Sequence, residues 1–421
     1  MKPPAWHIAL TLISIALALS IGTASAQSTL LTARQDWPQF RGPNRDGRSA
    51  ARGLLQQWPE GGPKLLWSMQ GIGKGFSQVS AAGDLIYVSG LVDKQGMLHA
   101  YSRDGKLKWE ASYGPEWEKS YPGARSIPTV HDGLVYVASG VGNFACFDAL
   151  TGKSVWSSNV FQLYDAPQVD WGFAESLLID GENVICTPCG KKATMVALNR
   201  KTSQQVWASE PLGQGSSFCS PLLVERGGKR IIVSMTEDAV VAFSATDGKP
   251  LWQHAYANPR NNHPITPIYD NGLLYITSGY GKGAIGLALA DDGLSVKQIW
   301  EQRRQDPAHG QAVLVDGYVY ASSHQSAAGK WTCVELATGR LAWQAPGVGK
   351  GGSIIYADGL LYCYSEDGVV GLMRPNPEAC QVLSTFKVPL GADQHWAHPT
   401  VADGRLYIRH GDALMCYDIA K

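Results

Sequence analysis

The sequence has no excess of charge of either sign. Its 36 lysines and arginines are balanced by 36 aspartates and glutamates, and charged residues make up only 17% of the chain. A protein that binds the phosphate backbone needs a surplus of basic residues, so we do not expect a nucleic acid as a partner. The sequence also lacks a Cys-x-x-Cys-His motif, which excludes a covalently attached haem of the c type.

A segment long enough to span a membrane is missing as well. The longest apolar run covers residues 8–21, which is shorter than the roughly 20 residues that cross a bilayer. Lys2 precedes this run and the small-residue sequence ASA follows it at residues 24–26, as in a cleavable export signal. We therefore expect residues 1–26 to be a signal peptide cut after Ala26, and the mature protein to be periplasmic or extracellular.

Glycine and tryptophan are abundant instead, with 47 and 14 copies, which suits many short strands joined by tight turns. Comparison of the sequence with itself reveals one repeated phrase, of which SIPTVHDGLVYVASGVGNFACFDALTGKSVW is the clearest copy. The copies end, at steps of about 43 to 51 residues, in Trp109, Trp156, Trp207, Trp252, Trp300 and Trp343, with Phe386 in the equivalent place of a degenerate copy. Steps of this length are typical of four-stranded propeller blades.

The first turn of the phrase, usually Asp-Gly, occurs eight times, at residues 83–84, 132–133, 180–181, 227–228, 271–272, 316–317, 358–359 and 403–404. We therefore predict an all-β protein, an eight-bladed β-propeller of four-stranded antiparallel blades. The last copy stops at CYDIAK, before its outer strand, whereas GGPKLLW at residues 61–67 reads like the missing turn and strand. An N-terminal strand should thus complete the last blade and close the ring, which removes an exposed sheet edge. Residues 61–421 would form the propeller and residues 27–60 an N-terminal strap.

The strap contains the sequence DWPQFRGPNRDG at residues 36–47. Its two aromatic rings and two arginines could form a ligand-binding loop or could tie the segment onto the propeller. We expect a strap, with Trp37 and Phe40 in a groove and with Arg41 or Arg45 paired with a carboxylate.

The repeats over roughly residues 60–421 resemble those of the pyrroloquinoline quinone (PQQ)-like propellers. This superfamily contains the quinoprotein alcohol dehydrogenases and the propeller lipoprotein of the bacterial outer-membrane assembly machine. The leader with Trp37-Pro38, Phe40-Arg41-Gly42-Pro43 and Gly47 resembles that of exported PQQ-like repeat proteins whose function is largely unassigned. The resemblance implies the fold, but a shared fold does not fix the activity.

The quinoprotein enzymes of this superfamily carry a vicinal Cys-Cys disulfide, a tryptophan beneath the quinone, and a calcium ion beside a catalytic aspartate. No two cysteines are adjacent in this chain. Cys186 and Cys189 have Cys-x-x-Cys spacing, which leaves open a local disulfide, thiol exchange or buried thiols. Three further cysteines share one place on the third strand of their blades, where we expect small buried side chains: Cys146, Cys333 and Cys416. If calcium is bound, the candidate ligands are Asp165, Asp170 and Glu175.

Alignment of the blades on their first turn places corresponding residues around the central channel. One such column reads Phe76, Arg125, Phe173, Phe218, Pro264, His309, Gly351 and Trp396. A second, two places further on, reads Gln78, Ile127, Glu175, Ser220, Thr266, Gln311, Ser353 and His398. Strand parity puts both on one side of the innermost strand, and a slip of one residue would reverse the facing.

From these columns we predict a cofactor or ligand site at one mouth of the channel, formed by Phe76, Gln78, Arg125, Phe173, Glu175, His309, Trp396 and His398. A few polar groups among apolar walls suit a small, flat, anionic or polar ligand, although water alone could also fill such a channel. The long connections after Trp109 and Trp156 should emerge beside it and contain six aromatic residues, Tyr113, Trp117, Tyr121, Phe161, Tyr164 and Trp171. These rings would form an exposed binding surface or would pack on one another.

Two functions remain open from the sequence. The favoured one is an exported, non-enzymatic binding or scaffold propeller that holds a protein, a glycan or a small ligand at the channel mouth. The alternative is a PQQ-dependent oxidoreductase, similar to the alcohol or sugar dehydrogenases, that uses PQQ with calcium.

Overall fold

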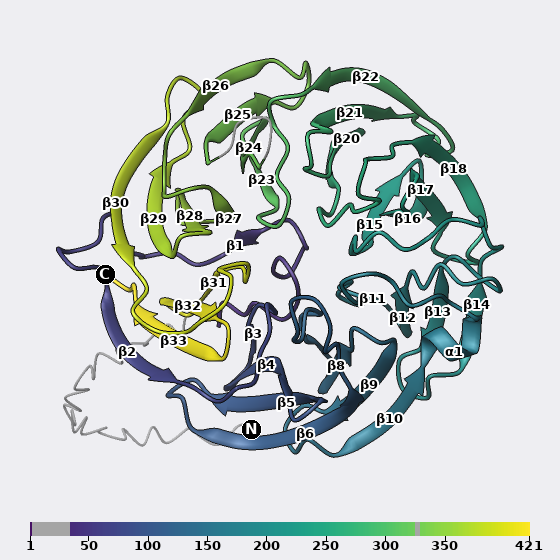
Figure 1. Ribbon diagram of the computed structural model, residues 1–421, viewed down its shortest axis with the longest axis horizontal. Coiled ribbons are helices and arrows are strands. Elements are labelled where there is room, and N and C mark those ends of the chain that lie inside the picture. Colours follow the sequence, from purple (N-terminus) through teal and green to yellow (C-terminus); the bar gives the residue numbers. More distant parts are fainter. Residues whose placement is uncertain (2–33, 325–328) are drawn as a thin grey trace. The chain divides into compact units, whose positions relative to one another are not determined.

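The computed structural model describes residue 1, residues 34–324 and residues 329–421 (Figure 1). The expected signal peptide and the first residues of the expected strap lie outside this described part. The chain divides into two compact units, Met1–Arg34 and Gln35–Lys421, and the strands of the described residues belong to the second unit. In the described residues, no helix has the length and apolar character needed to cross a bilayer.

Residues 35–421 contain the eight-bladed propeller that the repeats predict, and each blade has four antiparallel strands. In blade 7 the sheet is extended by one short parallel strand from the N-terminal segment. Blades 1 to 4, in chain order, consist of β3 (Ser80–Ala82), β4 (Leu85–Val92), β5 (Gln95–Ser102) and β6 (Leu107–Pro115); β7 (Thr129–His131), β8 (Leu134–Ala138), β9 (Asn143–Asp148) and β10 (Ser154–Asn159); β11 (Leu178–Asp180), β12 (Asn183–Cys186), β13 (Val196–Asn199) and β14 (Gln205–Ala208); and β15 (Leu222–Arg226), β16 (Lys229–Met235), β17 (Ala239–Ser244) and β18 (Pro250–Ala255).

Blades 5 to 7 follow with the same order of strands. They consist of β19 (Ile268–Asp270), β20 (Leu273–Thr277), β21 (Ala284–Leu289) and β22 (Val296–Gln302); β23 (Ala312–Val315), β24 (Tyr318–Ser322), β25 (Trp331–Glu335) and β26 (Leu341–Ala345); and β27 (Gly352–Ala357), β28 (Leu360–Ser365), β29 (Val369–Arg374) and β30 (Gln381–Lys387). In the described residues the one helix, α1 (Val160–Tyr164), lies in the connection between blades 2 and 3.

Blade 8 is built from both ends of the propeller sequence. The strands β31 (Thr400–Ala402), β32 (Arg405–His410) and β33 (Ala413–Asp418) supply its inner part, and β2 (Lys64–Met69) pairs antiparallel with β33 as its outer strand. The predicted closure of the ring by an N-terminal strand is therefore confirmed. In Figure 1 the purple β2 and the yellow β33 lie side by side.

The tryptophan that ends each repeat joins its blade to the next one. Its indole N–H donates to a backbone carbonyl of the following blade, as in Trp156 to Arg200 at 2.8 Å and Trp300 to Leu336 at 2.8 Å. A small buried residue on the third strand lies opposite each tryptophan and makes room for the ring: Ala100, Cys146, Ala197, Ala242, Gly286, Cys333 and Cys416. The expected small buried position of the three cysteines is thus confirmed.

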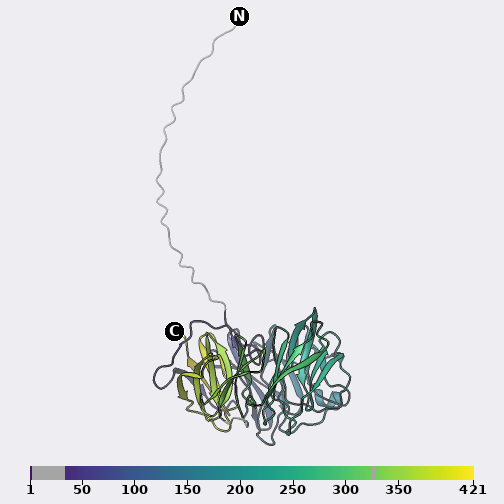
Figure 2. The same ribbon diagram turned by 90° about the horizontal axis from the view of Figure 1, so that it is seen from above.

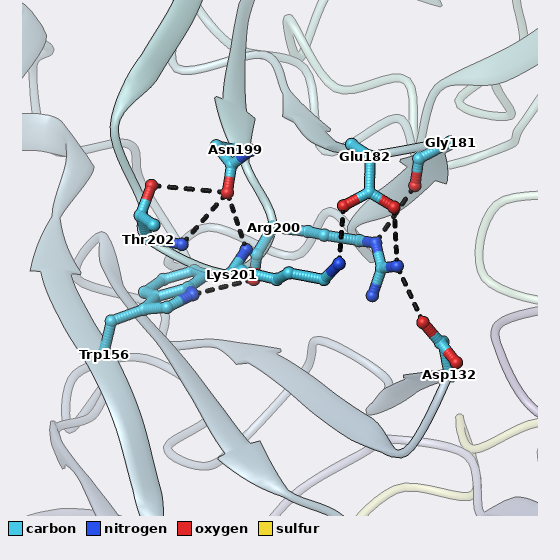
Figure 3. A network of polar contacts seen from close by, with 8 residues as sticks. All are labelled: Asp132, Trp156, Gly181, Glu182, Asn199, Arg200, Lys201 and Thr202. Atoms are coloured by element: carbon cyan, nitrogen blue, oxygen red, sulfur yellow. Dashed lines mark hydrogen bonds and ion pairs between the residues drawn. The ribbon is translucent and has the colours of Figure 1, made fainter.

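A network around Arg200 strengthens one of these blade contacts (Figure 3). Its guanidinium donates to Asp132 in the first turn of blade 2 and to Glu182 in the first turn of blade 3, both at 2.8 Å. The Arg200 carbonyl meanwhile accepts the indole N–H of Trp156. Backbone and side chain of one residue therefore hold two neighbouring blades together.

The propeller has two different faces, because the strands of each blade are antiparallel and therefore alternate in direction. Figure 2 shows the propeller edge-on, with one face above and the other below. The turns between first and second strands, such as Asp132-Gly133, and between third and fourth strands, such as residues 149–153, lie on one face, which we call the turn face. The turns between second and third strands, and the connections between blades, such as residues 116–128, lie on the other, which we call the loop face.

The N-terminal segment occupies the central channel instead of lying in a groove along the propeller. We call residues 36–49 the plug. Its backbone pairs with the innermost strands of blades 1 and 7, through Trp37 with Ala81 and through β1 (Arg48–Ser49) with β27. The plug also bonds to blade 2 through the Pro38 carbonyl and to blade 8 through the Ser49 hydroxyl. In Figure 1 this purple segment crosses the centre of the ring.

The two plug arginines extend these contacts to blades 3 and 6. Arg41 donates to the carbonyls of Arg45, Asp46 and Ala312, and Arg45 donates to the carbonyls of Ser176 and Leu177. The expected pairing with a carboxylate is wrong: in the described part of the chain, neither guanidinium has a carboxylate oxygen within salt-bridge distance. The burial of Trp37 and Phe40 agrees with the expected packing role, but their surroundings are the channel.

Candidate functional site

A cavity of about 460 Å³ opens at the channel mouth on the loop face. Its walls come from the connections between blades and from the turns between second and third strands. Six of the eight predicted site residues line it: Phe76, Gln78, Arg125, His309, Trp396 and His398. Five further members of the two aligned columns do so too, namely Ile127, Phe218, Ser220, Pro264 and Gln311. Whether they hold a ligand stays a prediction.

The other two predicted site residues lie away from this cavity. Phe173 is fully buried between the rings of Phe144 and Phe161, at 5.6 and 5.5 Å. Glu175 is buried as well and accepts the backbone N–H of Thr187 at 3.0 Å. Burial raises the pKa of Glu175 to about 8, against the opposing effect of the Thr187 hydrogen bonds. Phe173 packs in the core between blades 2 and 3, and Glu175 turns to the segment after β12, so the equivalent positions of blade 3 do not face the cavity.

Trp396 is the centre of a group of rings on the cavity wall. The imidazole of His309 stacks on it at 4.3 Å between centroids, and Tyr121 and Phe76 lie at 5.0 and 5.2 Å. Aromatic pairs at such distances add stability beyond the area that they bury. The indole is therefore held in one place, and one of its faces is already covered by His309.

Two guanidinium groups give the cavity a positive wall. Arg125 donates to the carbonyls of Gly123 and Tyr121 at 2.6 and 2.5 Å, and burial lowers its pKa to about 10 although Glu116 opposes the shift. Arg260, in the connection between blades 4 and 5, also lines the cavity and is exposed. In the described residues, no aspartate or glutamate lines this cavity, so the wall is suited to an anionic group.

The floor of the cavity includes a residue of the plug. The ring of Phe40 lies 5.7 Å from the ring of His398, and both line the cavity. The Nε2 atom of His398 lies 2.8 Å from the His309 carbonyl, so it carries the hydrogen. Burial lowers the pKa of His398 to about 4, which keeps this imidazole neutral near pH 7. The cavity is consequently closed at its base by the N-terminal segment.

The aromatic residues of the two long connections divide into two groups. Four of them are buried: Tyr113, Trp117, Phe161 and Tyr164. The other two, Tyr121 and Trp171, are exposed or half-buried and line the cavity. The hypothesis of one exposed surface of six rings is therefore wrong for the first four, and the alternative of packing holds for them.

Several wall residues were not among the candidates from the sequence: Ala174, Arg260, Asn262, Tyr280 and His324. Tyr280 and His324 lie in turns between second and third strands. These turns vary in length from blade to blade, so the aligned columns could not include them. Their position directly after a second strand could have identified them as wall residues, because the turns after second strands lie on the loop face with the connections between blades.

The calcium and quinone arrangement does not fit these residues. In the part of the chain that the structure describes, no group of three His, Cys, Asp or Glu side chains could hold a metal ion. Of the candidate ligands, Asp165 pairs with Lys191 at 3.5 Å and Glu175 is buried against Thr187. The Trp396 face that could carry a flat ring is stacked on His309. We therefore derive no chemistry through PQQ.

All eight cysteines are unpaired. For Cys186 and Cys189 the structure supports buried thiols over a disulfide, and burial raises the pKa of both. A thiol whose ionisation is suppressed by burial is a poor nucleophile. Thiol exchange at this pair is not supported by its surroundings.

Comparison with known protein families gives one match along most of the chain. The family model described as outer membrane protein assembly factor BamB matches residues 56–159, 94–345 and 292–421. An uncharacterised protein of Rickettsia conorii is 24% identical over 238 residues, which cover 53% of this chain and 52% of that protein. The outer membrane protein assembly factor BamB of Burkholderia pseudomallei is 25% identical over 253 residues, which cover 58% and 60%. The chain thus matches about half to three fifths of the length of these relatives.

Solved structures share the fold. The crystal structure of BamB from Moraxella catarrhalis has a TM-score of 0.62 at 16% identity, covering 85% of this chain and 100% of that one. A europium-containing methanol dehydrogenase has a TM-score of 0.64 at 12% identity, covering 90% of each chain. At such identities the likeness shows the propeller fold alone, and it extends to BamB and to a dehydrogenase alike.

Proposed function

The chain belongs to the family described as outer membrane protein assembly factor BamB, and from this premise we propose that it is an exported, non-enzymatic propeller that binds a protein partner on its loop face. The observation that carries the proposal is the cavity at the channel mouth. It is closed below by the plug and walled by aromatic rings and two guanidiniums. Rings and arginines are the side chains that most often dominate the energy of protein interfaces.

A protein partner is preferred to a glycan or a small molecule because relatives of this chain are named as assembly factors for outer membrane proteins. The periplasm is the compartment in which such a partner would be met, in keeping with the expected signal peptide. The dehydrogenase alternative rests on fold likeness and on a partial sequence match to a quinoprotein ethanol dehydrogenase, 27% identical over 160 residues. In the described residues no fitting metal cluster adds support to it.

Site-specific photocrosslinking in the native cell tests the proposal. Tyr121, which is 44% exposed at the rim of the cavity, is replaced by p-benzoylphenylalanine. Leu150, which is 75% exposed in a third turn on the turn face, receives the same replacement as the matched control. We expect a discrete crosslinked protein of the outer-membrane assembly machinery from position 121 and none from position 150. Equal crosslinking from both positions, or none from position 121, would contradict the proposal.

A titration of the mature protein with PQQ, with and without calcium, tests the enzyme alternative directly. We expect no calcium-dependent heat and no change in the visible spectrum of the quinone. Micromolar binding that requires calcium would instead make the oxidoreductase function the better one, and would justify assays with alcohols, sugars and an artificial electron acceptor.

A further inference from the structure

The aromatic residues with a strained backbone all lie on the wall of the cavity. Four aromatic residues have a positive φ, namely Tyr121 at 53°, Trp171 at 65°, Phe218 at 72° and Tyr280 at 57°. In the described part of the chain these are all the aromatic residues with positive φ, and every one of them lines the cavity. Bulky residues rarely adopt this conformation. Strained positions persist only where the surroundings hold them, and they cluster at functional sites.

The surroundings of these residues explain how the strain is maintained. The Tyr121 carbonyl accepts from the Arg125 guanidinium, and its ring packs on Trp396. The Tyr280 hydroxyl accepts from the amide of Asn262 at 3.3 Å. Asparagine or glycine would relieve the backbone at each position, so the rings are kept at a cost to stability. The simplest reason for keeping the rings is that they themselves contact a binding partner.

A second cavity of about 350 Å³ adjoins the first. Trp171 lines both cavities, and the second is completed by Trp117, Lys119, Ser120, Gln168, Val169 and Asp170. The two hollows thus share one strained indole. Two adjoining hollows suit an extended chain better than a single compact small molecule.

The charges of the two cavities are mostly of one sign. Arg125 and Arg260 lie on the first wall and Lys119 on the second, and Asp170 is the one carboxylate among the described lining residues. In the described structure the Arg260 guanidinium has no hydrogen-bond or ion-pair partner. The backbone N–H of Arg260 donates to the side chain of Asn258. Glu366 lies near the rim but already faces His309 at 3.5 Å. An arriving carboxylate would therefore meet an unpaired cation.

We propose that the two cavities form one recognition site for an extended stretch of a partner polypeptide that carries acidic and aromatic side chains. The partner's rings pack against the four strained aromatic residues, and its carboxylates pair with Arg260 and Lys119. This inference rests on the proposed function, because it names the chemistry of the partner at the same face. It adds that the binding is selective for negative charge.

The test is selection from a random heptapeptide library displayed on phage, with the purified mature protein as the bait. We expect enrichment of peptides that combine aspartate or glutamate with an aromatic residue. The enrichment should be lost with a double variant, Arg260→Gln with Lys119→Gln. It should be kept with Arg374→Gln, which removes an exposed guanidinium from blade 7 outside both cavities. Enrichment of neutral or basic peptides, no enrichment, or unchanged selection by the double variant would each overturn the inference.

A substitution at a strained position separates recognition from folding. Tyr121→Asn places a residue that tolerates positive φ at an exposed site, so we expect an unchanged or higher melting temperature. We also expect at least a tenfold loss of affinity for a selected peptide, measured by fluorescence polarisation. Unchanged affinity would overturn the role of the strained rings. The crosslinking experiment at position 121 judges the proposed function separately, because it detects a partner of any charge.

Discussion

The ring of Phe40, from the plug, lies 5.7 Å from the imidazole of His398, in the connection that leads into the innermost strand of blade 8, with their planes 32° apart. The first residue belongs to the segment that precedes the propeller, and the second to its last blade. Their contact closes the base of the cavity on the loop face. The binding site that we propose is therefore incomplete without the N-terminal segment.

Phe40→Ala should weaken both the fold and the site. Phe40 is 5% exposed, and removal of a buried phenylalanine ring costs about 3 to 5 kcal/mol. We expect a loss of this order in the free energy of unfolding from denaturant titration, together with weaker binding of a selected acidic peptide. Phe40→Leu keeps most of the apolar volume and should recover most of both. Full stability of the alanine variant would show that the ring is not part of the packed base.

Arg41→Met tests whether the plug holds the channel through its carbonyl contacts. The substitution leaves the carbonyls of Arg45, Asp46 and Ala312 without their donor, and an unpaired buried polar group costs about 1 to 3 kcal/mol. We expect a loss of about 3 kcal/mol in the free energy of unfolding. The control is Arg52→Met, because Arg52 is an exposed arginine outside the plug whose bonds are local. Equal effects of the two variants would contradict a channel-holding role.

Gly62→Ala should destabilise the ring at the place where it closes. A Cβ atom at residue 62 would lie 2.7 Å from the Cβ of Phe386 in blade 7, and the residue has φ of 98°. Gly61 shares the positive φ, at 82°, but has open space around it. Gly61→Ala therefore introduces backbone strain without a steric clash. We expect Gly62→Ala to be less stable than Gly61→Ala by about 1 to 3 kcal/mol, the usual cost of overpacking, in thermal or denaturant unfolding.

Glu175→Gln should change how stability depends on pH. Because burial raises the pKa of Glu175 from 4.5 to about 8, the folded state binds this proton more tightly than the unfolded state does. The resulting stability is fully present below about pH 4.5, is lost as the pH rises to about 8, and is constant above that. Glutamine cannot titrate, so the variant should gain stability relative to the wild type across this window.

The expected gain is about 1.4 kcal/mol for each unit of pKa difference. Denaturant unfolding of the two proteins at pH 5 and at pH 8.5 measures it, and a constant difference between them at both pH values would show that Glu175 is ionised in the folded protein. The backbone N–H of Thr187 can donate to the glutamine oxygen as it does to the carboxyl. The comparison therefore isolates the charge.

The ring and its closure could be predicted from the sequence because their signals are local. Each Asp-Gly turn requires a backbone with positive φ, as at Gly133 with 73°, and each terminal tryptophan needs a small residue opposite it and a carbonyl in the next blade. These needs recur in most of the blades, so they leave a visible period. The incomplete last repeat and the extra strand at residues 61–67 then fit together.

The position of the plug could not be predicted in the same way. Arg41 and Arg45 bind backbone carbonyls, which every residue has, so no particular sequence identifies their partners. The same limit applies to the buried aromatic residues of the long connections. Tyr113, for example, is covered because Gly96 leaves room for its ring and Glu116 accepts its hydroxyl. Only the folded chain brings these groups together.

The predicted site residues meet at one cavity where neighbouring blades repeat one another, and they do not where the blades differ; whether the cavity is a binding site stays a prediction. Phe76, Arg125, His309 and Trp396 occupy equivalent places and meet at the cavity. Phe173 turns into the space between blades, where α1 and its neighbours form a local core that other blades lack. Tyr280 lies in a turn whose length is particular to blade 5.

The pairing of β2 with β33 also has a consequence for the synthesis of the protein. A chain that stops before Ala413 has no partner for Lys64–Met69, and an incomplete ring presents unpaired strand edges on both sides of the gap. Such edges invite aggregation and proteolysis. The strand β2 therefore finds its place only after β33 has been made. Only a chain with all its blades forms a closed ring. Unfinished chains thus expose unpaired strand edges and finished chains do not, and this difference exists before the protein meets any partner.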